Sequence, residues 1–362
     1  MENQPTNNEL SGMNVAPAMP KNRAMDTWIK LLLFVVILLL VGAGGIYVGK
    51  FLSERDSFTI AEEYLPNEQR GIEVDTSRFG AVGTLFLTLR PADKSEPSNI
   101  YTYDIATKTL KKESRLPSGS NITSTLSPDS SLFAFARHEA EGVMQIYIAD
   151  EAKQTLERIT NSAHRYKREP RWSPDGKSIV YVAQSQDADP HTPEGWLIYL
   201  TGLKGVEDFI DRGYSPVFSP TGEELLYLKN NGLYLYSLAE RKTRLVYAAA
   251  EGQEIHSHMK LALSHSGSML AWSDHHANKE EGLLTIFDVQ WSPFELRTKK
   301  VLNQFAVYTA FSPDDKYLAI DVSTLNPYID LLNLENFEAQ KILDLSGYTP
   351  DYLWLTDWRT NK

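Results

Sequence analysis

The chain contains 362 residues, has no cysteine and carries a formal net charge of −11. The lack of cysteine excludes disulfide bonds, thiolate metal sites, a cysteine nucleophile and a lipid attached to cysteine. The acidic balance argues against a nucleic-acid-binding protein, because such a protein needs a basic surface to displace counterions from phosphate.

The first part of the chain predicts a tail followed by a membrane anchor. Residues 1–27 are rich in Asn, Pro, Met and Ala without helical or strand periodicity, and they predict a disordered cytoplasmic tail. A charge-free stretch follows from Leu31 to Gly49. At about 1.5 Å per residue it is long enough to cross a hydrocarbon core of about 30 Å. We therefore expect one transmembrane helix over residues 28–52, with a cleavable signal peptide as the alternative.

The charges beside this helix predict its orientation. Lys21, Arg23 and Lys30 precede the charge-free stretch, and Lys50 and Arg55 follow it. Because positive charge is enriched on the cytoplasmic side, the N-terminus is expected in the cytoplasm. The rest of the chain is then periplasmic or extracellular, and the protein is a single-pass cell-membrane protein.

Gly45 and Gly49 form a GxxxG match near the end of the helix. This spacing lets two helices approach closely, so a homodimer through these glycines is one alternative. Near a helix end, such a match is more often just a pair of small residues.

Residues 53–79 are charged and show little pattern, and Pro66 and Gly71 break any long helix. No strand series or helix periodicity fills the segment. It is expected to be a stem that connects the membrane helix to residues 80–362.

A single turn recurs throughout residues 80–362. Its fullest copy is residues 173–176, Ser-Pro-Asp-Gly, in which proline presets φ, the Asp carboxylate accepts from nearby N–H groups and glycine accepts a positive φ. The spacings of the turn serines are 46 (127 to 173), 46 (173 to 219), 45 (219 to 264) and 48 (264 to 312). These values fall in the range of roughly 40 to 50 residues that is typical of propeller blades.

Two short apolar runs accompany each repeat, and both series have six members. The first runs lie at residues 85–87, 132–135, 179–182, 225–228, 269–272 and 317–320. The second runs lie at residues 100–104, 146–150, 196–199, 233–236, 284–288 and 328–332. Short aromatic and β-branched runs separated by turns predict an all-β fold, a six-bladed β-propeller.

The two ends of the repeat region predict how the ring closes. The segment 352–358 contains a strand without a following partner, and the first repeat, around residues 85–112, lacks a good Ser-Pro turn before it. Pairing the C-terminal strand with the first blade would remove two open sheet edges at once. We expect Trp172, in the fullest repeat, to belong to the core.

The repeat, above all residues 169–177 (EPRWSPDGK), resembles the TolB-like or PD40 repeat, a WD40-like β-propeller repeat. The resemblance covers roughly residues 80–358. It implies a propeller outside the cytoplasm that binds proteins or other ligands. Relatives among the peptidases add an α/β-hydrolase domain, whereas this sequence has no G-x-S-x-G motif. TolB adds an α/β domain before its propeller, for which the stem is too short.

Among residue types that could bind a metal or take part in catalysis, histidine alone is unevenly distributed along the chain. Five of the eight histidines lie in the fifth repeat, namely His256, His258, His265, His275 and His276. Propeller topology places all but His265 on one face. Four imidazoles there would suit a polar ligand, zinc or copper, with a solvated loop as the alternative. Because no carboxylate stands at ligand spacing, neither a metal nor a cofactor is predicted.

The same face receives the longest connections, at residues 91–98, 185–195 and 274–282. Arg165, Lys167 and Arg168 are expected to enter it as well. Insertions on one face of a repeat protein often mark its binding surface, although exposed loops are polar in any case. The predicted ligand- or partner-binding residues are Asp187, Asp189, His191, His256, His258, His275 and His276.

These features together predict a membrane-anchored extracytoplasmic propeller that acts as a non-catalytic platform for a protein partner or a small ligand. No H-E-x-x-H, phosphate-binding Gly loop or EF-hand loop points to an enzyme. Two alternatives stay open. One is a propeller hydrolase or lyase with a His-lined site on the loop-rich face, and the other is a structural component of an envelope complex.

Overall fold

A computed structural model gives the structure of most of residues 80–361. Short gaps fall at residues 93–95, 140–141, 188, 190–191, 193–194, 231, 250–252, 255–259, 277–282, 305, 323–324 and 350–351. The predicted tail, transmembrane helix and stem lie outside the described residues. Within the described part, no helix has the length and apolar character to cross a bilayer.

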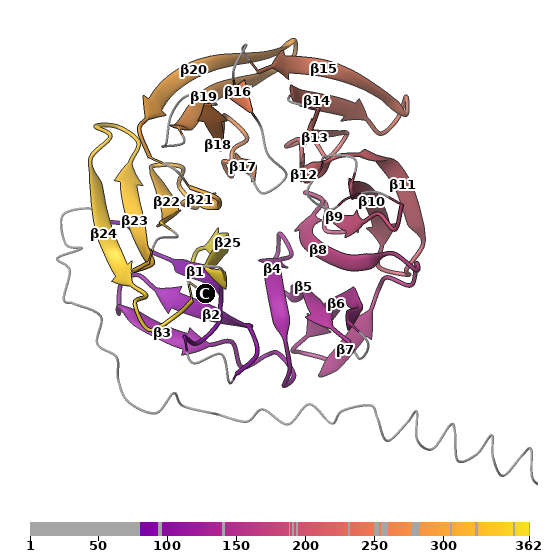
Figure 1. Ribbon diagram of the computed structural model, residues 1–362, viewed down its shortest axis with the longest axis horizontal. Helices are drawn as coiled ribbons and strands as arrows, with labels where there is room; N and C mark the ends of the chain where they lie inside the picture. The colour runs from indigo at the N-terminus through magenta and orange to yellow at the C-terminus, as the bar shows by residue number, and fades with distance from the viewer. Residues whose placement is uncertain are drawn as a thin grey trace, which may run out of the picture. The chain divides into compact units, whose positions relative to one another are not determined.

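Six antiparallel sheets stand around a central axis as the blades of a propeller (Figure 1). From the axis outward, blade 1 contains β25 (Trp354–Arg359), β1 (Thr84–Leu89), β2 (Asn99–Asp104) and β3 (Thr109–Lys112). Blade 2 contains β4 (Asn121–Leu126), β5 (Leu132–His138), β6 (Met144–Asp150) and β7 (Thr155–Arg158). Blade 3 contains β8 (Arg165–Trp172), β9 (Ser178–Gln184), β10 (Trp196–Gly202) and β11 (Glu207–Arg212).

The second half of the ring repeats this order. Blade 4 contains β12 (Tyr214–Phe218), β13 (Glu224–Lys229), β14 (Gly232–Ser237) and β15 (Lys242–Ala248). Blade 6 contains β21 (Thr309–Phe311), β22 (Tyr317–Val322), β23 (Tyr328–Asn333) and β24 (Ala339–Asp344). Blade 5 contains β18 (Met269–His276), β19 (Leu283–Trp291) and β20 (Phe294–Leu302), preceded by two short inner strands.

These inner strands of blade 5 are β16 (Gln253–Glu254) and β17 (Ala262–Leu263), and both pair with β18. The inner position of this blade is therefore divided, whereas the other five blades each have one inner strand in the described residues. Blade 5 is thus the least regular blade.

The predicted six-bladed fold is confirmed, and every predicted apolar run lies in the second or third strand of its blade. These strands are packed on both faces because neighbouring blades cover them. In β9, Ile179 through Ala183 are all buried, as are Leu225 through Leu228 in β13. Double-sided burial explains why the runs are nearly continuous in apolar character.

The expected closure of the ring is also confirmed. β25, from the end of the chain, pairs antiparallel with β1, from Thr84 opposite Arg359 to Thr88 opposite Trp354. The Trp358 side chain is fully buried, and its Nε1 donates to the carbonyl oxygen of Val82 at 3.1 Å. Both open edges are removed by one strand pairing.

The serine of each turn closes that turn through its hydroxyl. Ser173 Oγ accepts from the N–H of Ser178 at 3.0 Å and donates to the Asp175 carboxylate at 2.6 Å. The same acceptor role falls to Ser127, Ser219, Ser264 and Ser312. The repeat thus needs serine for turn geometry and not for chemistry.

The proline and glycine of these turns also join neighbouring blades. A Cβ atom built on Gly222 would lie 3.3 Å from Pro174 Cδ, and one built on Gly267 would lie 2.1 Å from Pro220 Cγ. Each turn glycine therefore packs against the proline of the preceding turn. No side chain fits at Gly267 without moving Pro220.

We predict that Gly267→Ala destabilises the protein more than Gly142→Ala. Both glycines have φ of +73°, so alanine strains the backbone equally at the two positions. Nothing, however, lies within 4 Å of a Cβ on Gly142. Overpacking against Pro220 should add about 1–3 kcal/mol to the loss at position 267. Thermal melts of the two variants check this, and equal melting temperatures would contradict the packing role.

Trp172 lies between blades 2 and 3, as predicted for a core residue. Its side chain is buried beside Ile122 and Tyr181, and its Nε1 donates to the carbonyl oxygen of Thr125 at 3.3 Å. It therefore links the two blades through both packing and a hydrogen bond.

We expect Trp172→Ala to lower the free energy of unfolding by about 3–5 kcal/mol, because it leaves a cavity between two blades. Trp172→Phe, which keeps most of the ring volume, should lose clearly less. Urea unfolding of both variants measures the difference. If Trp172→Ala unfolds at the same urea concentration as the original chain, Trp172 does not support the core.

Candidate functional site

The predicted site residues are only partly within the described structure. Asp187 and Asp189 are exposed in the connection between β9 and β10. His191, His256 and His258 lie outside the described residues. His275 and His276 end β18, where the backbone pairs them with Glu254 and Gln253 of β16. A shared site of these histidines and aspartates therefore stays a prediction.

The long connections do lie on one face, between the second and third strands of their blades. Residues 90–98 join β1 to β2, and residues 185–195 join β9 to β10, whereas only residues 230–231 join β13 to β14. The connection in blade 5 is shorter than expected, because pairing with β16 continues β18 as far as His276. We call the side of the propeller that carries these connections the loop-rich face.

Lys167 differs from the expectation that it enters this face as a surface charge. Its side chain is fully buried, and its Nζ donates to the carbonyl oxygens of Ser162 and His164, both at 2.7 Å. Burial lowers the pKa of Lys167 to about 8. This lysine fixes the chain as it enters blade 3 and is not available to a partner.

A ring of side chains around the central axis was not predicted from the sequence. The ring consists of the residues four positions before each turn serine, namely Thr123, Glu169, Ser215, Lys260 and Tyr308. All five are buried. Aligning the repeats on their serines and reading this position would have found them.

Backbone geometry directs three of these side chains. Thr123, Glu169 and Ser215 have φ values of 41°, 59° and 53°, and the register of each inner strand shifts there. Such bulges re-aim a side chain. Thr123 Oγ1 accepts from the N–H of Glu169 at 3.0 Å, and Ser215 Oγ accepts from the N–H of Leu261 at 2.7 Å. Each hydroxyl thereby ties its blade to the next.

The bulged residue of blade 3 is a glutamate, and it forms an ion pair with blade 5. Lys260 Nζ lies 2.7 Å from Glu169 Oε1, and the two side chains are only 4% and 6% exposed. Arg168 Nε lies 3.1 Å from the same oxygen. The pair joins two blades that are not neighbours in the ring (Figure 1).

Further charged groups continue this cluster toward blade 1. Arg171 Nη1 donates to the carbonyl oxygen of Thr356 at 2.7 Å. Arg359 Nε donates to the Asp357 carboxylate at 2.9 Å. Blades 1, 3 and 5 therefore all contribute charge near the axis.

Charge and burial act against each other on the central groups. Burial opposes ionisation of Glu169, but Lys260, Arg168 and Arg171 outweigh it and hold the pKa of Glu169 below its usual value. Burial lowers the pKa of Lys260 to about 8, although Glu169 acts in the other direction. Burial raises the pKa of Asp321 well above its usual value.

We predict that Glu169→Gln destabilises the protein by about 3–5 kcal/mol, because it removes the carboxylate that pairs with the buried Lys260. The double variant Glu169→Gln with Lys260→Met should regain most of that loss. Urea unfolding of the single and double variants checks both expectations. A single variant as stable as the original chain would show that the ion pair does not hold the centre together.

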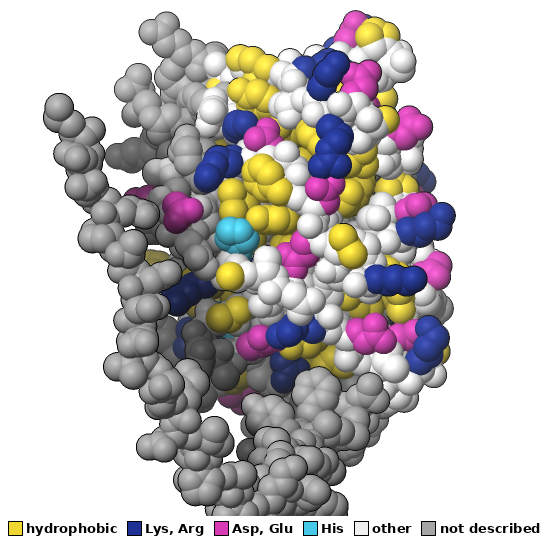
Figure 2. Space-filling view, turned by 90° about the vertical axis from the view of Figure 1, so that its right-hand side faces the viewer, with side chains coloured by type: hydrophobic (Ala, Val, Ile, Leu, Met, Phe, Trp, Pro, Cys, Tyr) yellow, Lys and Arg dark blue, Asp and Glu magenta, His cyan; other side chains and the backbone are white. Residues whose placement is uncertain are grey.

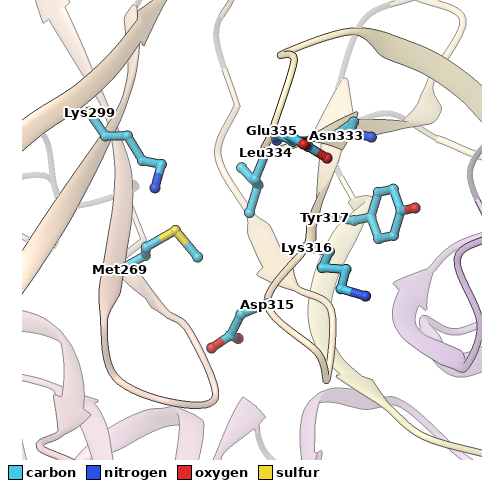
Figure 3. A pocket seen from close by; sticks show the side chains of 8 residues that line it. All are labelled: Met269, Lys299, Asp315, Lys316, Tyr317, Asn333, Leu334 and Glu335. Atoms are coloured by element: carbon cyan, nitrogen blue, oxygen red, sulfur yellow. Dashed lines mark hydrogen bonds between the residues drawn. The ribbon is translucent and has the colours of Figure 1, made fainter.

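A shallow depression of about 240 Å³ lies between blades 5 and 6, on the face opposite the long connections (Figure 3). Lys299 and Met269 approach it from blade 5, and Lys316, Tyr317 and Glu335 from blade 6. Its charges have partners within the protein. Lys299 Nζ lies 3.1 Å from Asp288 Oδ1, and the Asp315 carboxylate accepts from the N–H groups of His265 and Ser266. This depression serves the contact between two blades.

Among the described residues, no group of three or more histidine, aspartate or glutamate side chains is placed to hold a metal ion. The cluster at the axis is instead a set of ion pairs and hydrogen bonds. It brings guanidinium and ammonium groups close to carboxylates, so its contacts are charge-assisted.

Comparison with known proteins establishes the fold. No family profile and no curated protein matches the sequence. TolB from Acinetobacter baumannii is similar, with a TM-score of 0.60 and 17% identity over 77% of this chain and 67% of that one. An oligogalacturonate lyase in complex with manganese has a TM-score of 0.53 and 14% identity over 72% of this chain and 78% of that one.

A chain of a nidogen/laminin complex is similar to the same extent, with a TM-score of 0.53 and 14% identity over 76% of this chain and 97% of that one. Proteins with different activities thus share this architecture. At these identities the likeness concerns the fold alone. The described residues form a TolB-like six-bladed β-propeller.

Proposed function

We propose that the chain is a single-pass membrane protein whose propeller acts outside the cytoplasm as a non-catalytic platform that binds a protein partner at its loop-rich face. The observation that carries the proposal is the uneven length of the connections. They range from residues 185–195 in blade 3 to residues 230–231 in blade 4, and they concentrate on one face. Connections that differ in length on one face of a regular repeat protein are typical of a binding surface.

The opposite face supports this assignment by contrast. The serine of each turn closes that turn by a hydrogen bond. The glycine of one turn packs against the proline of the preceding turn, as Gly222 does against Pro174. The Asp315 carboxylate is engaged by the backbone of the neighbouring turn. These groups are used for holding the blades together, which leaves few of them to engage a partner.

The outer rim offers no broad apolar surface on the side formed by blades 3 and 4. Its exposed apolar residues include Val206, Phe209 and Leu245. Figure 2 shows apolar side chains there interrupted by Lys, Arg, Asp and Glu side chains of both signs. Stable docking sites usually need a larger continuous apolar centre.

The membrane anchor gives the platform its physical advantage. A propeller tethered by residues 28–52 is confined near the membrane, and its effective concentration towards partners there rises. Pairing of two anchors through Gly45 and Gly49 would add avidity and would suit a structural role in an envelope complex.

A hydrolase or lyase is the second candidate. The observation that favours it is the backbone register that sets Glu254 opposite His275 in blade 5, beside His276. A carboxylate residue and imidazole residues so close in register are the ingredients of general acid–base chemistry. Tightly bound metal in the purified full-length protein, together with His256 and His258 being needed for it, would favour this candidate over the platform.

We predict that shortening the blade-three connection abolishes partner binding. In the test, tagged full-length protein is crosslinked in membranes and its partners are identified by mass spectrometry. In one variant, residues 185–195 are replaced by Asn-Asn, as in the blade-four connection. In a second variant, Asp187, His191, His275 and His276 are changed to alanine.

The matched control carries His265→Ala and Lys177→Ala on the opposite face. A defined partner that is lost in the two loop-rich-face variants and kept in the control is the expected result. The same partners in all four proteins, or loss only in the control, would contradict the assignment of the loop-rich face.

A further inference from the structure

The inner strand of blade 3 concentrates positive charge in a chain that is acidic overall. Residues 165–171 hold four cationic side chains and one carboxylate, in a protein with a net charge of −11. Lys167 is occupied by two backbone carbonyls. Arg168 and Arg171 are left beside the Glu169–Lys260 ion pair, where both contribute to the electrostatic environment of Glu169.

The charges at this point do not balance within the described residues. Among the described residues, Glu169 acts on Arg168 and Arg171, and Asp357 acts on Arg171 as well. Asp357 already accepts from Arg359, from Thr125 Oγ1 at 3.1 Å and from the N–H of Leu126 at 3.2 Å. Because buried charges are normally paired, an additional anion would complete the set.

Unused hydrogen-bond donors accompany the excess of positive charge. Among the described residues, the Nη1 and Nη2 atoms of Arg168 make no hydrogen bond, and Arg171 uses Nη1 alone, toward Thr356. The guanidinium of Arg168 stacks on Trp196, with its Cζ 4.0 Å from the ring centroid, which holds the plane of the group. A fixed guanidinium fork matches the two oxygens of a carboxylate.

Arg168 lies toward the loop-rich end of blade 3, and its side chain is 22% exposed. Trp196 is the first residue of β10, directly after the 185–195 connection, so Arg168 lies at the same end of the blade. Arg165 and Tyr166 begin the same inner strand and are exposed, and Tyr166 has a φ of 50° at a second register shift. Bulges of this kind often lie beside binding sites.

We infer that Arg168 and Arg171, beside Lys260, bind a carboxylate group of a ligand that approaches the propeller axis from the loop-rich face. The inference rests on the proposed function, because it assigns a chemistry to what that face binds. The carboxylate belongs either to an acidic peptide segment or to a small polycarboxylate, and both are held by the same donors.

Calorimetric titration of the full-length protein in mild detergent tests the inference. The probes are a hexaglutamate peptide, citrate and, as the neutral control, a hexaglutamine peptide. The variants are Arg168→Gln, Arg171→Gln and Arg168→Lys, which keeps the charge and loses the fork. Lys177→Gln, on an exposed turn of the opposite face, is the matched control, and thermal melts establish that each variant is folded.

At least one carboxylate probe is expected to bind, with affinity at least tenfold lower in each arginine variant and unchanged in Lys177→Gln. Binding of hexaglutamate identifies a peptide ligand, and binding of citrate alone identifies a small polycarboxylate. The inference is overturned if neither probe binds, if hexaglutamine binds equally well, or if the arginine variants bind as the original chain does.

The outcome is separable from that of the proposed function. Failure here, with partner crosslinking still lost on shortening residues 185–195, would refute the carboxylate site and leave the platform intact. Carboxylate binding without any crosslinked partner would support the carboxylate site and refute the proposed protein-binding platform.

Discussion

Closure of the ring is the constraint on which the rest of the structure depends. Once β25 pairs with β1, six inner strands must share the small space around one axis. The strands meet this demand with bulges at Thr123, Glu169 and Ser215, which turn side chains toward neighbouring blades. A glutamate at this position needs a counter-charge because it is buried, and Lys260 supplies it.

The same constraint separates the two faces of the protein. The face opposite the loop-rich face, called the turn face here, is held together by short serine-closed turns. Its residues therefore stabilise the closed ring. The connections on the other face are not needed to close any blade, and they are free to differ in length. In the function proposed above, recognition depends on those connections and on the charged side chains around the axis, whereas stability depends on the turns and inner strands.

Much of the fold could be predicted from local patterns, because the signals that specify it are local. The serine turns and the double-sided apolar strands recur at a nearly constant spacing, so their number sets the number of blades. The axial cluster could not be predicted in this way. Glu169 and Lys260 belong to blades that are not adjacent, and only the closed ring brings them within 2.7 Å. Lys167 resembles a surface residue in sequence, yet the chain folds back to bind it.

Hydroxyl-radical footprinting of the full-length protein would show whether the loop-rich face is the surface that binds a partner. Side-chain oxidation would be compared between native membranes and purified protein in detergent. We expect protection in native membranes at Tyr166 and within residues 185–195, with Pro174 and His265 on the turn face unchanged. Protection of the turn face, with the loop-rich face oxidised equally in both samples, would contradict this expectation.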